Sequence, residues 1–141
     1  MKVKLGGKEY TIQFATRPSL KSHILQDIMK IQDMEDISSV EDILLETLPK
    51  TLLAGLQMHH NEEFGYDYKT NEGYDEQLEK VSNILYDAID TNEINCMDLF
   101  ADMQKEMMTN GFLAQMMESL EKAREQEKEK KKTPSKAKVK N

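Results

Sequence analysis

The pattern of hydrophobic and polar residues along the chain changes once, just after Phe14. Up to that point apolar and polar residues alternate, which is typical of β-strands with one buried face. Gly6-Gly7 separates the two alternating runs and suits the positive φ angles of a two-residue hairpin turn. Residues 1–14 therefore predict a β-hairpin. Because an isolated hairpin is marginal in water, we expect it to dock on helices or to extend a larger sheet.

The register of this hairpin follows from the same pattern. Pairing Leu5 with Lys8 brings the apolar side chains of both strands to one face. The other pairs on this face are Val3 with Tyr10 and Met1 with Ile12. A slip of one residue would turn the whole set to the solvent, so we predict the register that pairs Leu5 with Lys8.

Beyond the hairpin, apolar residues recur every three or four positions, which predicts helices. Ser19 is a candidate N-cap for a first helix, and Ser38 with Glu41 has the spacing of a capping box that opens a second. Pro49 interrupts the apolar stripe of the second helix, so we expect a kink or two short helices there. Residues 59–73 lack periodicity and are expected to form a connector.

Two further helices complete the expected fold. The third contains the apolar residues from Leu78 to Ile89, and Thr91 or Asn92 is expected to cap the fourth. Asn110-Gly111 is a stop signal. The predicted class is mainly α, with an N-terminal β-hairpin followed by a small helical bundle in a single domain over residues 1–120.

Charge divides the chain into two parts. The whole sequence has a net charge of −7, but residues 121–141 alone carry nine basic and four acidic residues, a net +5, which leaves −12 for residues 1–120. We expect 121–141 to be a charged helical extension followed by a disordered basic tail, because it has too few apolar residues for a core. The tail is either a solvated end or a means of electrostatic capture of an acidic partner. The acidic body argues against nucleic-acid binding by bulk charge.

Candidate metal ligands occur in one short run of the sequence, His59-His60 with Glu62 and Glu63. The run lies in the expected connector without further ligands nearby, and paired or exposed histidines are commoner than ligands, which argues against a metal site. The segment Asp67–Gly73 resembles a calcium loop, but its glycine falls at position seven where an EF-hand needs it at position six. We therefore expect no metal.

The sequence also lacks the usual signatures of catalysis and of cofactor binding. Cys96 is the single cysteine, it lies in a helical stretch without a nearby histidine, and a small core residue explains it better than a nucleophile does. There is no GxSxG, P-loop or GxGxxG pattern. No apolar run approaches the length of a membrane span. We expect a cytoplasmic protein that is not an enzyme and binds no cofactor.

Methionine is the most informative residue type. Six of the ten methionines lie between residues 97 and 117. Flexible thioethers suit an adaptable partner-binding surface, although an ordinary methionine-rich core accounts for the same pattern, and both interpretations stay open. The candidate partner-binding residues are Met103, Met107, Met108, Phe112, Met116 and Met117.

The opening KVKLGGKEYTIQFATRPSL resembles the start of tail assembly chaperones from long-tailed phages and prophages of Gram-positive bacteria. Those proteins begin with a strand, a Gly-containing turn and a strand of the pattern K-x-Y-x-hydrophobic-x-F, and then continue as helices. The acidic middle and the Lys-rich end are similar too, so the resemblance covers about residues 1–120 in overall character. The matching residues are Leu5, Gly7, Lys8, Tyr10, Ile12 and Phe14.

The resemblance implies both a function and partners. In that family the protein, together with a longer form made by ribosomal frameshifting, binds the tape measure protein, keeps its hydrophobic helices soluble and recruits the major tail protein. It works in the host cytoplasm and is not part of the mature virion. The run Lys130-Lys131-Lys132 fits an A-rich slippery site, a hypothesis that the codons would test.

The chemistry of the chain is compatible with such a role. Methionines supply adaptable apolar surface, the acidic body keeps a complex soluble, and coating a long client favours several copies, hence a homo-oligomer. We expect client contacts at the Met103–Met117 face and at the hairpin edge, which could pair with another strand. The alternatives are a non-enzymatic helical adaptor or structural phage protein and, third, a nucleic-acid-binding regulator that acts through residues 121–141.

Overall fold

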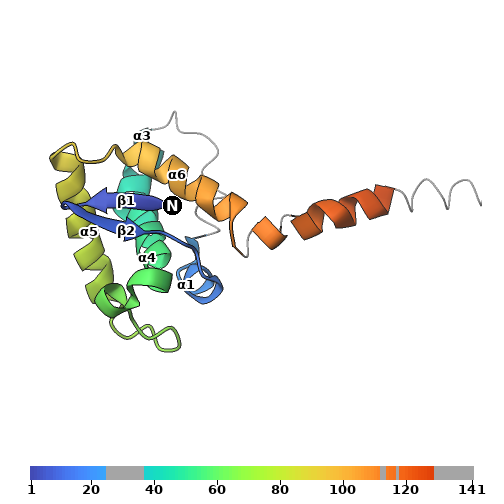
Figure 1. Ribbon diagram of the computed structural model, residues 1–141, viewed down its shortest axis with the longest axis horizontal. Coiled ribbons are helices and arrows are strands. Elements are labelled where there is room, and N and C mark those ends of the chain that lie inside the picture. The colour runs from blue at the N-terminus through green and yellow to red at the C-terminus, as the bar shows by residue number, and fades with distance from the viewer. Residues whose placement is uncertain (25–36, 112–113, 117, 129–141) are drawn as a thin grey trace, which may run out of the picture.

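The computed structural model describes residues 1–24, 37–111, 114–116 and 118–128. Its fold class is the predicted one, mainly α with an N-terminal β-hairpin followed by a small helical bundle. Figure 1 shows the hairpin lying against the helices and a helical extension that leaves the body of the molecule. The predicted disordered tail falls on residues 129–141, which lie outside the described residues.

The hairpin consists of β1 (Lys2–Leu5) and β2 (Lys8–Thr11), paired antiparallel with Leu5 opposite Lys8. Gly6 and Gly7 have φ angles of 61° and 79°, the left-handed values that a type I′ turn requires. Residues that follow β2 continue the pairing, since the N–H of Ile12 donates to the carbonyl oxygen of Met1 at 2.7 Å. Both the predicted turn and the predicted register are confirmed.

The tip of the hairpin is held by a residue far along the chain. The carboxylate of Glu93 accepts the N–H groups of both Gly6 and Gly7, the latter at 2.9 Å. Each N–H group donates to a different oxygen of this carboxylate, and successive backbone N–H groups of a turn commonly bind an anion in this way. Glu93 lies in the loop between the last two helices of the body, and it ties that loop to the hairpin.

Helix α1 (Thr16–Lys21) begins three residues before the predicted cap. Ala15 occupies the N-cap position, and Ser19 is buried within the helix, so the prediction of a Ser19 cap is wrong. The helix can begin before Pro18 because proline is tolerated in the first turn of a helix, where the N–H groups have no intrahelical partner. The apolar residues from 25 to 31 of the predicted first helix lie outside the described residues.

Three consecutive elements replace the predicted second helix: α3 (Ile37–Asp42), η1 (Ile43–Thr47) and α4 (Leu48–Phe64). The element η1 is a π-helical turn, in which the N–H of Leu48 donates to the oxygen of Ile43, five residues earlier. Pro49 follows at the start of α4, so its missing N–H falls at the change of helix type. The backbone stays in the right-handed helical region at Thr47 and Leu48, and the expected kink at Pro49 is replaced by the wide turn before it.

Helix α4 continues six residues into the predicted connector and ends at Phe64. His60 departs from helical geometry, with φ −128° and ψ 32°, so the last turn of α4 is bent. Residues 65–73 then form the connector.

The last two helices of the body are α5 (Tyr74–Asp90) and α6 (Cys96–Thr109). Asn95 caps α6 by accepting the N–H groups of Met97 and Asp98, so the predicted cap at Thr91 or Asn92 is wrong. The turn before α6 is the reason, because Asn92 has a left-handed φ of 60° and cannot start a helix there. The predicted stop is confirmed, since α6 ends before Asn110 and Gly111 has a φ of 91°.

The core is built around α4, whose residues from Leu48 to Gln57 are buried except for half-buried Lys50. The apolar face of the hairpin packs on α4, and α5 and α6 contribute the remaining buried side chains. Gly55 allows the closest approach, since a Cβ atom at this position would lie 2.6 Å from Cγ2 of Ile12. The N–H of Gln13 donates to the oxygen of Gly55 at 3.0 Å, which joins the end of the hairpin directly to the helix backbone.

Candidate interaction surface

The structure separates the predicted partner-binding methionines into two groups. Met103 and Met107 are buried in the core, with 0% and 1% of their surface exposed. Met108 and Met116 are exposed, at 46% and 50%. Phe112 and Met117 lie outside the residues whose side chains are described.

Helical periodicity explains the separation. Leu99, Phe100, Met103 and Met107 recur at three- and four-residue spacing and face the body, whereas Met108 is one residue further on and is rotated by about 100° around the helix. For Met103 and Met107 the structure therefore differs from the expectation of an accessible surface, and the ordinary-core interpretation holds. Met108 and Met116 remain as candidate contact residues.

A helical extension follows Gly111, and we call its residues 114–128 the arm. Residues 114–116 and 118–128 are helical, and Figure 1 shows them projecting away from the body. Met116 and Leu120 are one helical turn apart and about half exposed. With Gln115, Ser119 and Thr16 of α1 they line an open groove of about 530 Å³ at the root of the arm.

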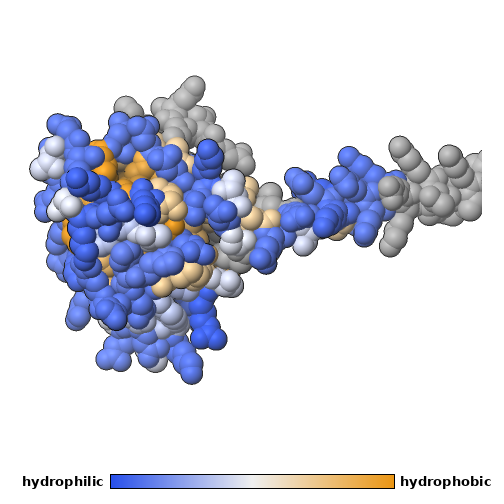
Figure 2. Space-filling view, in the orientation of Figure 1, coloured by the Kyte–Doolittle hydropathy of each residue, from blue (hydrophilic) through white to orange (hydrophobic). Residues whose placement is uncertain are grey.

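Leu120 was not among the predicted contact residues. The signal for it was present, because it follows Met116 at a spacing of four residues, which places both on one helix face. Figure 2 shows that the visible face of the body is mostly hydrophilic, with smaller hydrophobic areas among the polar residues.

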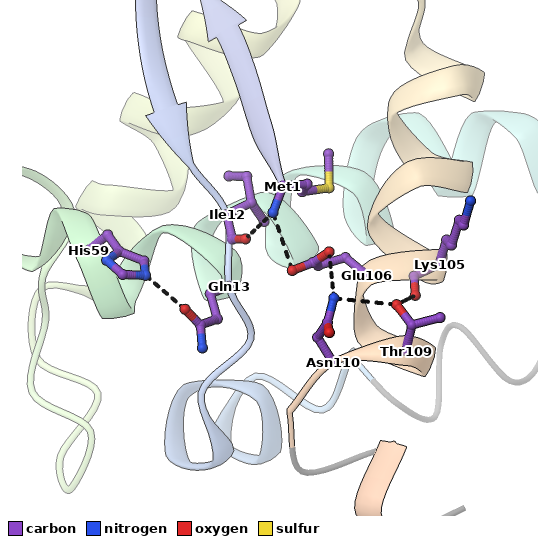
Figure 3. Close-up of polar contacts among 8 residues, drawn as sticks. All are labelled: Met1, Ile12, Gln13, His59, Lys105, Glu106, Thr109 and Asn110. Atoms are coloured by element: carbon purple, nitrogen blue, oxygen red, sulfur yellow. Dashed lines mark hydrogen bonds and ion pairs between the residues drawn. The ribbon is translucent and has the colours of Figure 1, made fainter.

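A polar cluster fixes the end of α6, just before the arm (Figure 3). The amino group of Met1 donates to the oxygen of Ile12 at 3.1 Å and lies 3.2 Å from a carboxylate oxygen of Glu106. The other carboxylate oxygen of Glu106 accepts a hydrogen bond from the side chain of Asn110 at 3.1 Å. Both members of the ion pair are largely buried, with 15% and 16% of their side-chain surface exposed. The open end of the hairpin is therefore joined to the end of α6.

The run His59-His60 with Glu62 and Glu63, for which the sequence argued against a metal, lies at the bent end of α4 and contacts the hairpin. Nε2 of His60 accepts the N–H of Thr11 at 2.9 Å, and Nε2 of His59 lies 2.8 Å from Oε1 of Gln13. All four residues of the run, with Lys8 of the hairpin, line a surface pocket of about 390 Å³. Across the described ranges, no three His, Cys, Asp or Glu side chains come together as a possible metal site.

Glu63 completes this contact between α4 and the hairpin. Its carboxylate accepts a hydrogen bond from Nζ of Lys8 at 2.7 Å, and the hydroxyl of Tyr10 lies 3.5 Å away. The hydrogen bond from Lys8 is the main reason that the pKa of Glu63 lies below its ordinary value. Burial is the main reason that the pKa of Tyr10 is raised. These contacts explain why residues 59–64 are helical although their sequence lacks an apolar stripe.

The two other candidate sites have structural roles. Oδ1 of Asp67 accepts the N–H groups of Lys69 and Thr70, which makes the calcium-like segment a tight turn. Cys96 is half buried at the start of α6 and packs against the core.

The free edge of the sheet is β1. On the other side, β2 is covered, because the N–H of Thr11 and the N–H of Gln13 already donate to α4. The described sheet has only the two strands, and β1 carries exposed lysines at Lys2 and Lys4. Lysines on an edge strand discourage pairing with further strands, so the hairpin edge is a weaker contact candidate than the arm.

Comparisons with protein-family models, with curated proteins and with solved structures return no match for this chain. Within the described residues, no helix has the length and apolar character needed to cross a membrane.

Proposed function

We propose that this chain is a tail assembly chaperone of a long-tailed phage or prophage. In this role it binds the tape measure protein, keeps that client soluble and promotes assembly of the tail tube with the major tail protein. It acts in the host cytoplasm and leaves before the virion is complete. It does so without catalysis or a cofactor.

The observation that carries the proposal is the opening of the chain. Residues of the pattern shared with that family occupy defined positions in and just after the hairpin: Gly7 lies in the turn, and the apolar members of the pattern are buried in the core. The helices follow directly, as they do in the family that the sequence resembles. A hairpin followed by helices is the arrangement that the resemblance leads us to expect, and this agreement supports the proposal.

The distribution of exposed apolar side chains supports the same proposal. A chaperone for long hydrophobic helices needs apolar surface that adapts to irregular partners, and methionine provides it. Met108 at the end of α6 and Met116 in the arm are exposed, within residues 1–120 whose net charge is strongly acidic. We infer that the client contacts these two residues, whereas Met103 and Met107 contribute to the core.

Co-expression with the tape measure protein encoded by the same phage genome tests the proposal. We expect the client to be insoluble alone and to be recovered in a soluble complex when this chain is present. Met108→Glu should reduce the recovery of the complex, and Leu45→Glu should not. Leu45 is a matched control, because it is also an exposed apolar residue, at 66%, on a different element, η1. An insoluble client and no complex with the wild-type chain would refute the proposal.

Analysis of purified virions separates the chaperone from its main alternative. A structural phage protein persists in the particle, whereas a chaperone is absent from it, so mass spectrometry of virions distinguishes the two.

A further inference from the structure

Two hydrogen bonds join the outer edge of the hairpin to α4, and their acceptors differ in kind. The N–H of Gln13, just after β2, donates to the main-chain oxygen of Gly55 at 3.0 Å. The N–H of Thr11, the last residue of β2, donates to Nε2 of His60 at 2.9 Å. A main-chain carbonyl does not titrate, whereas histidine ordinarily changes its charge between about pH 5 and 8. The two bonds therefore differ in their dependence on pH.

The contact with Thr11 defines the protonation state of His60. A neutral imidazole has one donor and one acceptor nitrogen, whereas a protonated imidazole has two donors. Because Nε2 accepts the N–H of Thr11, His60 is neutral in the structure and carries its proton on Nδ1. The ring of Tyr10 packs on the imidazole in a T-shaped arrangement, with the ring centroids 5.0 Å apart. Protonation of Nε2 would place two N–H groups opposite each other, and the hydrogen bond would be lost.

We propose that His60 is an acid-sensitive attachment point of the hairpin. Protonation of its imidazole releases the N–H of Thr11 and loosens this end of β2, while the bond from Gln13 to Gly55 keeps the following residues on α4. His60 is partly exposed and lines the surface pocket of about 390 Å³, so solvent protons reach the ring. The release does not depend on the proposed client.

The charged and titratable groups around His60 keep their charge in this pH range. The hydrogen bond between Lys8 of β2 and Glu63 of α4 raises the pKa of the lysine and lowers the pKa of the carboxyl group. Burial raises the pKa of Tyr10. Nζ of Lys80, on α5, donates to the main-chain oxygen of Glu63 at 3.0 Å. Carboxyl and ammonium groups ordinarily titrate outside the range of histidine. The other exposed charged side chains near this contact are Lys2, Glu9 and Glu62.

The neighbouring histidine, His59, provides an internal comparison (Figure 3). Its Nε2 lies 2.8 Å from Oε1 of Gln13. An amide oxygen only accepts, so this nitrogen of His59 is the donor. A protonated imidazole still donates, so acid leaves the contact of His59 in place. The two adjacent histidines therefore differ in their response to acid, because one donates to the hairpin and the other accepts from it.

NMR spectroscopy of the full-length chain between about pH 7.5 and about pH 5.5 tests the proposal. We expect Nε2 of His60 to carry no proton at the higher pH. As the ring becomes protonated, the amide proton resonance of Thr11 should move upfield with the same midpoint. Hydrogen exchange of this amide, corrected for the intrinsic effect of pH on exchange, should accelerate about tenfold. The amide of Gln13 should keep its protection.

Two substitutions assign the response to one imidazole. His60→Gln supplies an amide oxygen that can accept the N–H of Thr11 but does not titrate, so the Thr11 amide should no longer respond to pH in this range. His59→Gln is the matched control on the adjacent residue, and it should keep the response of the wild type.

Three results would overturn the proposal. The first is a neutral His60 that carries its proton on Nε2, and the second is a Thr11 amide that does not follow the protonation of His60. The third is a response of Thr11 that persists in His60→Gln. The first two are measured on the wild-type chain, so they decide the matter even where the glutamine variant does not fold. The purified chain alone is used throughout, so the outcome is independent of the client test.

Discussion

Neither the hairpin nor the arm is expected to fold stably alone, but only the hairpin is held by contacts along its whole length with the rest of the body. The hairpin is held at its turn by Glu93, along β2 by His60 and Glu63, and at its open end by Gly55 and Glu106. The arm projects from the body with its side chains from 118 to 128 exposed. Short two-stranded sheets and short helices are both marginal in water.

This difference indicates separate roles for the two parts. The residues that contact the hairpin are distant from it in sequence, so the hairpin joins several helices into one folded body. The apolar residues of the arm have no comparable cover within the described body, and they remain available to partners. The four changes below test this contrast, beginning with the largest expected effect.

Gly55→Val should disrupt the packing of the hairpin on α4. The new Cβ would lie 2.6 Å from Cγ2 of Ile12 and within 3.3 Å of the Phe14 ring, and a branched side chain leaves no room for either to move. We expect a loss of about 3 kcal/mol in the free energy of unfolding, measured by urea denaturation. Ala101→Val, on the exposed side of α6, is the control and should change stability little. Equal effects of the two changes would show that Gly55 is not a close-packing site.

Glu93→Ala should release the hairpin turn without disturbing the core. It removes the acceptor for the N–H groups of Gly6 and Gly7, and because these groups are exposed and water replaces the carboxylate, we expect a loss of about 1 kcal/mol. Hydrogen exchange of these two amides should accelerate. Glu79→Ala on α5 removes a charge of the same sign and serves as control. Unchanged exchange in the Glu93 variant would contradict the proposed clamp.

Lys8→Met should change how stability depends on pH. Because Lys8 holds the pKa of Glu63 below its ordinary value of 4.5, the contribution of this pair is complete above that value and is lost as the pH falls through the folded-state pKa. The difference in unfolding free energy between wild type and variant should therefore be largest near neutral pH and disappear in acid. Carboxyl NMR titration should show the pKa of Glu63 returning toward its ordinary value. A difference that grows in acid would contradict this account.

Leu120→Glu should have almost no effect on the stability of the body, in contrast to the three changes above. The side chain is 51% exposed and lies outside the core, so we expect a change of less than about 0.5 kcal/mol in unfolding free energy, measured by urea denaturation. A loss comparable to that of Gly55→Val would show that the arm belongs to the folded body.

The sequence was sufficient for features that depend on local pattern. The hairpin register followed from apolar alternation and the Gly6-Gly7 turn, because a slip of one residue would expose the whole apolar face. The stop at Asn110-Gly111 followed from the left-handed geometry that glycine adopts. These signals involve residues that are close together in the chain.

Other features depended on contacts between distant residues. The final turn of α4 has no apolar stripe, and its helical structure is supported by the contacts of His60 and Glu63 with the hairpin. The hydrogen bond from the N–H of Gly7 to Glu93 joins residues 86 positions apart, and no local sequence pattern predicts it. The methionines are a different case, because their number does not distinguish buried Met107 from exposed Met108, whereas the helical spacing of the buried residues does.

The division between body and arm is tested most directly by hydrogen exchange of the complex with the co-expressed tape measure protein, compared with that of the free chain. We predict that exchange slows around Met108 and along residues 114–128 when the client is bound, while the amides of the hairpin keep their free-chain rates. Protection that is confined to the hairpin, or an arm that exchanges equally fast in the complex, would contradict the assignment of the arm as the partner-binding part of the chain.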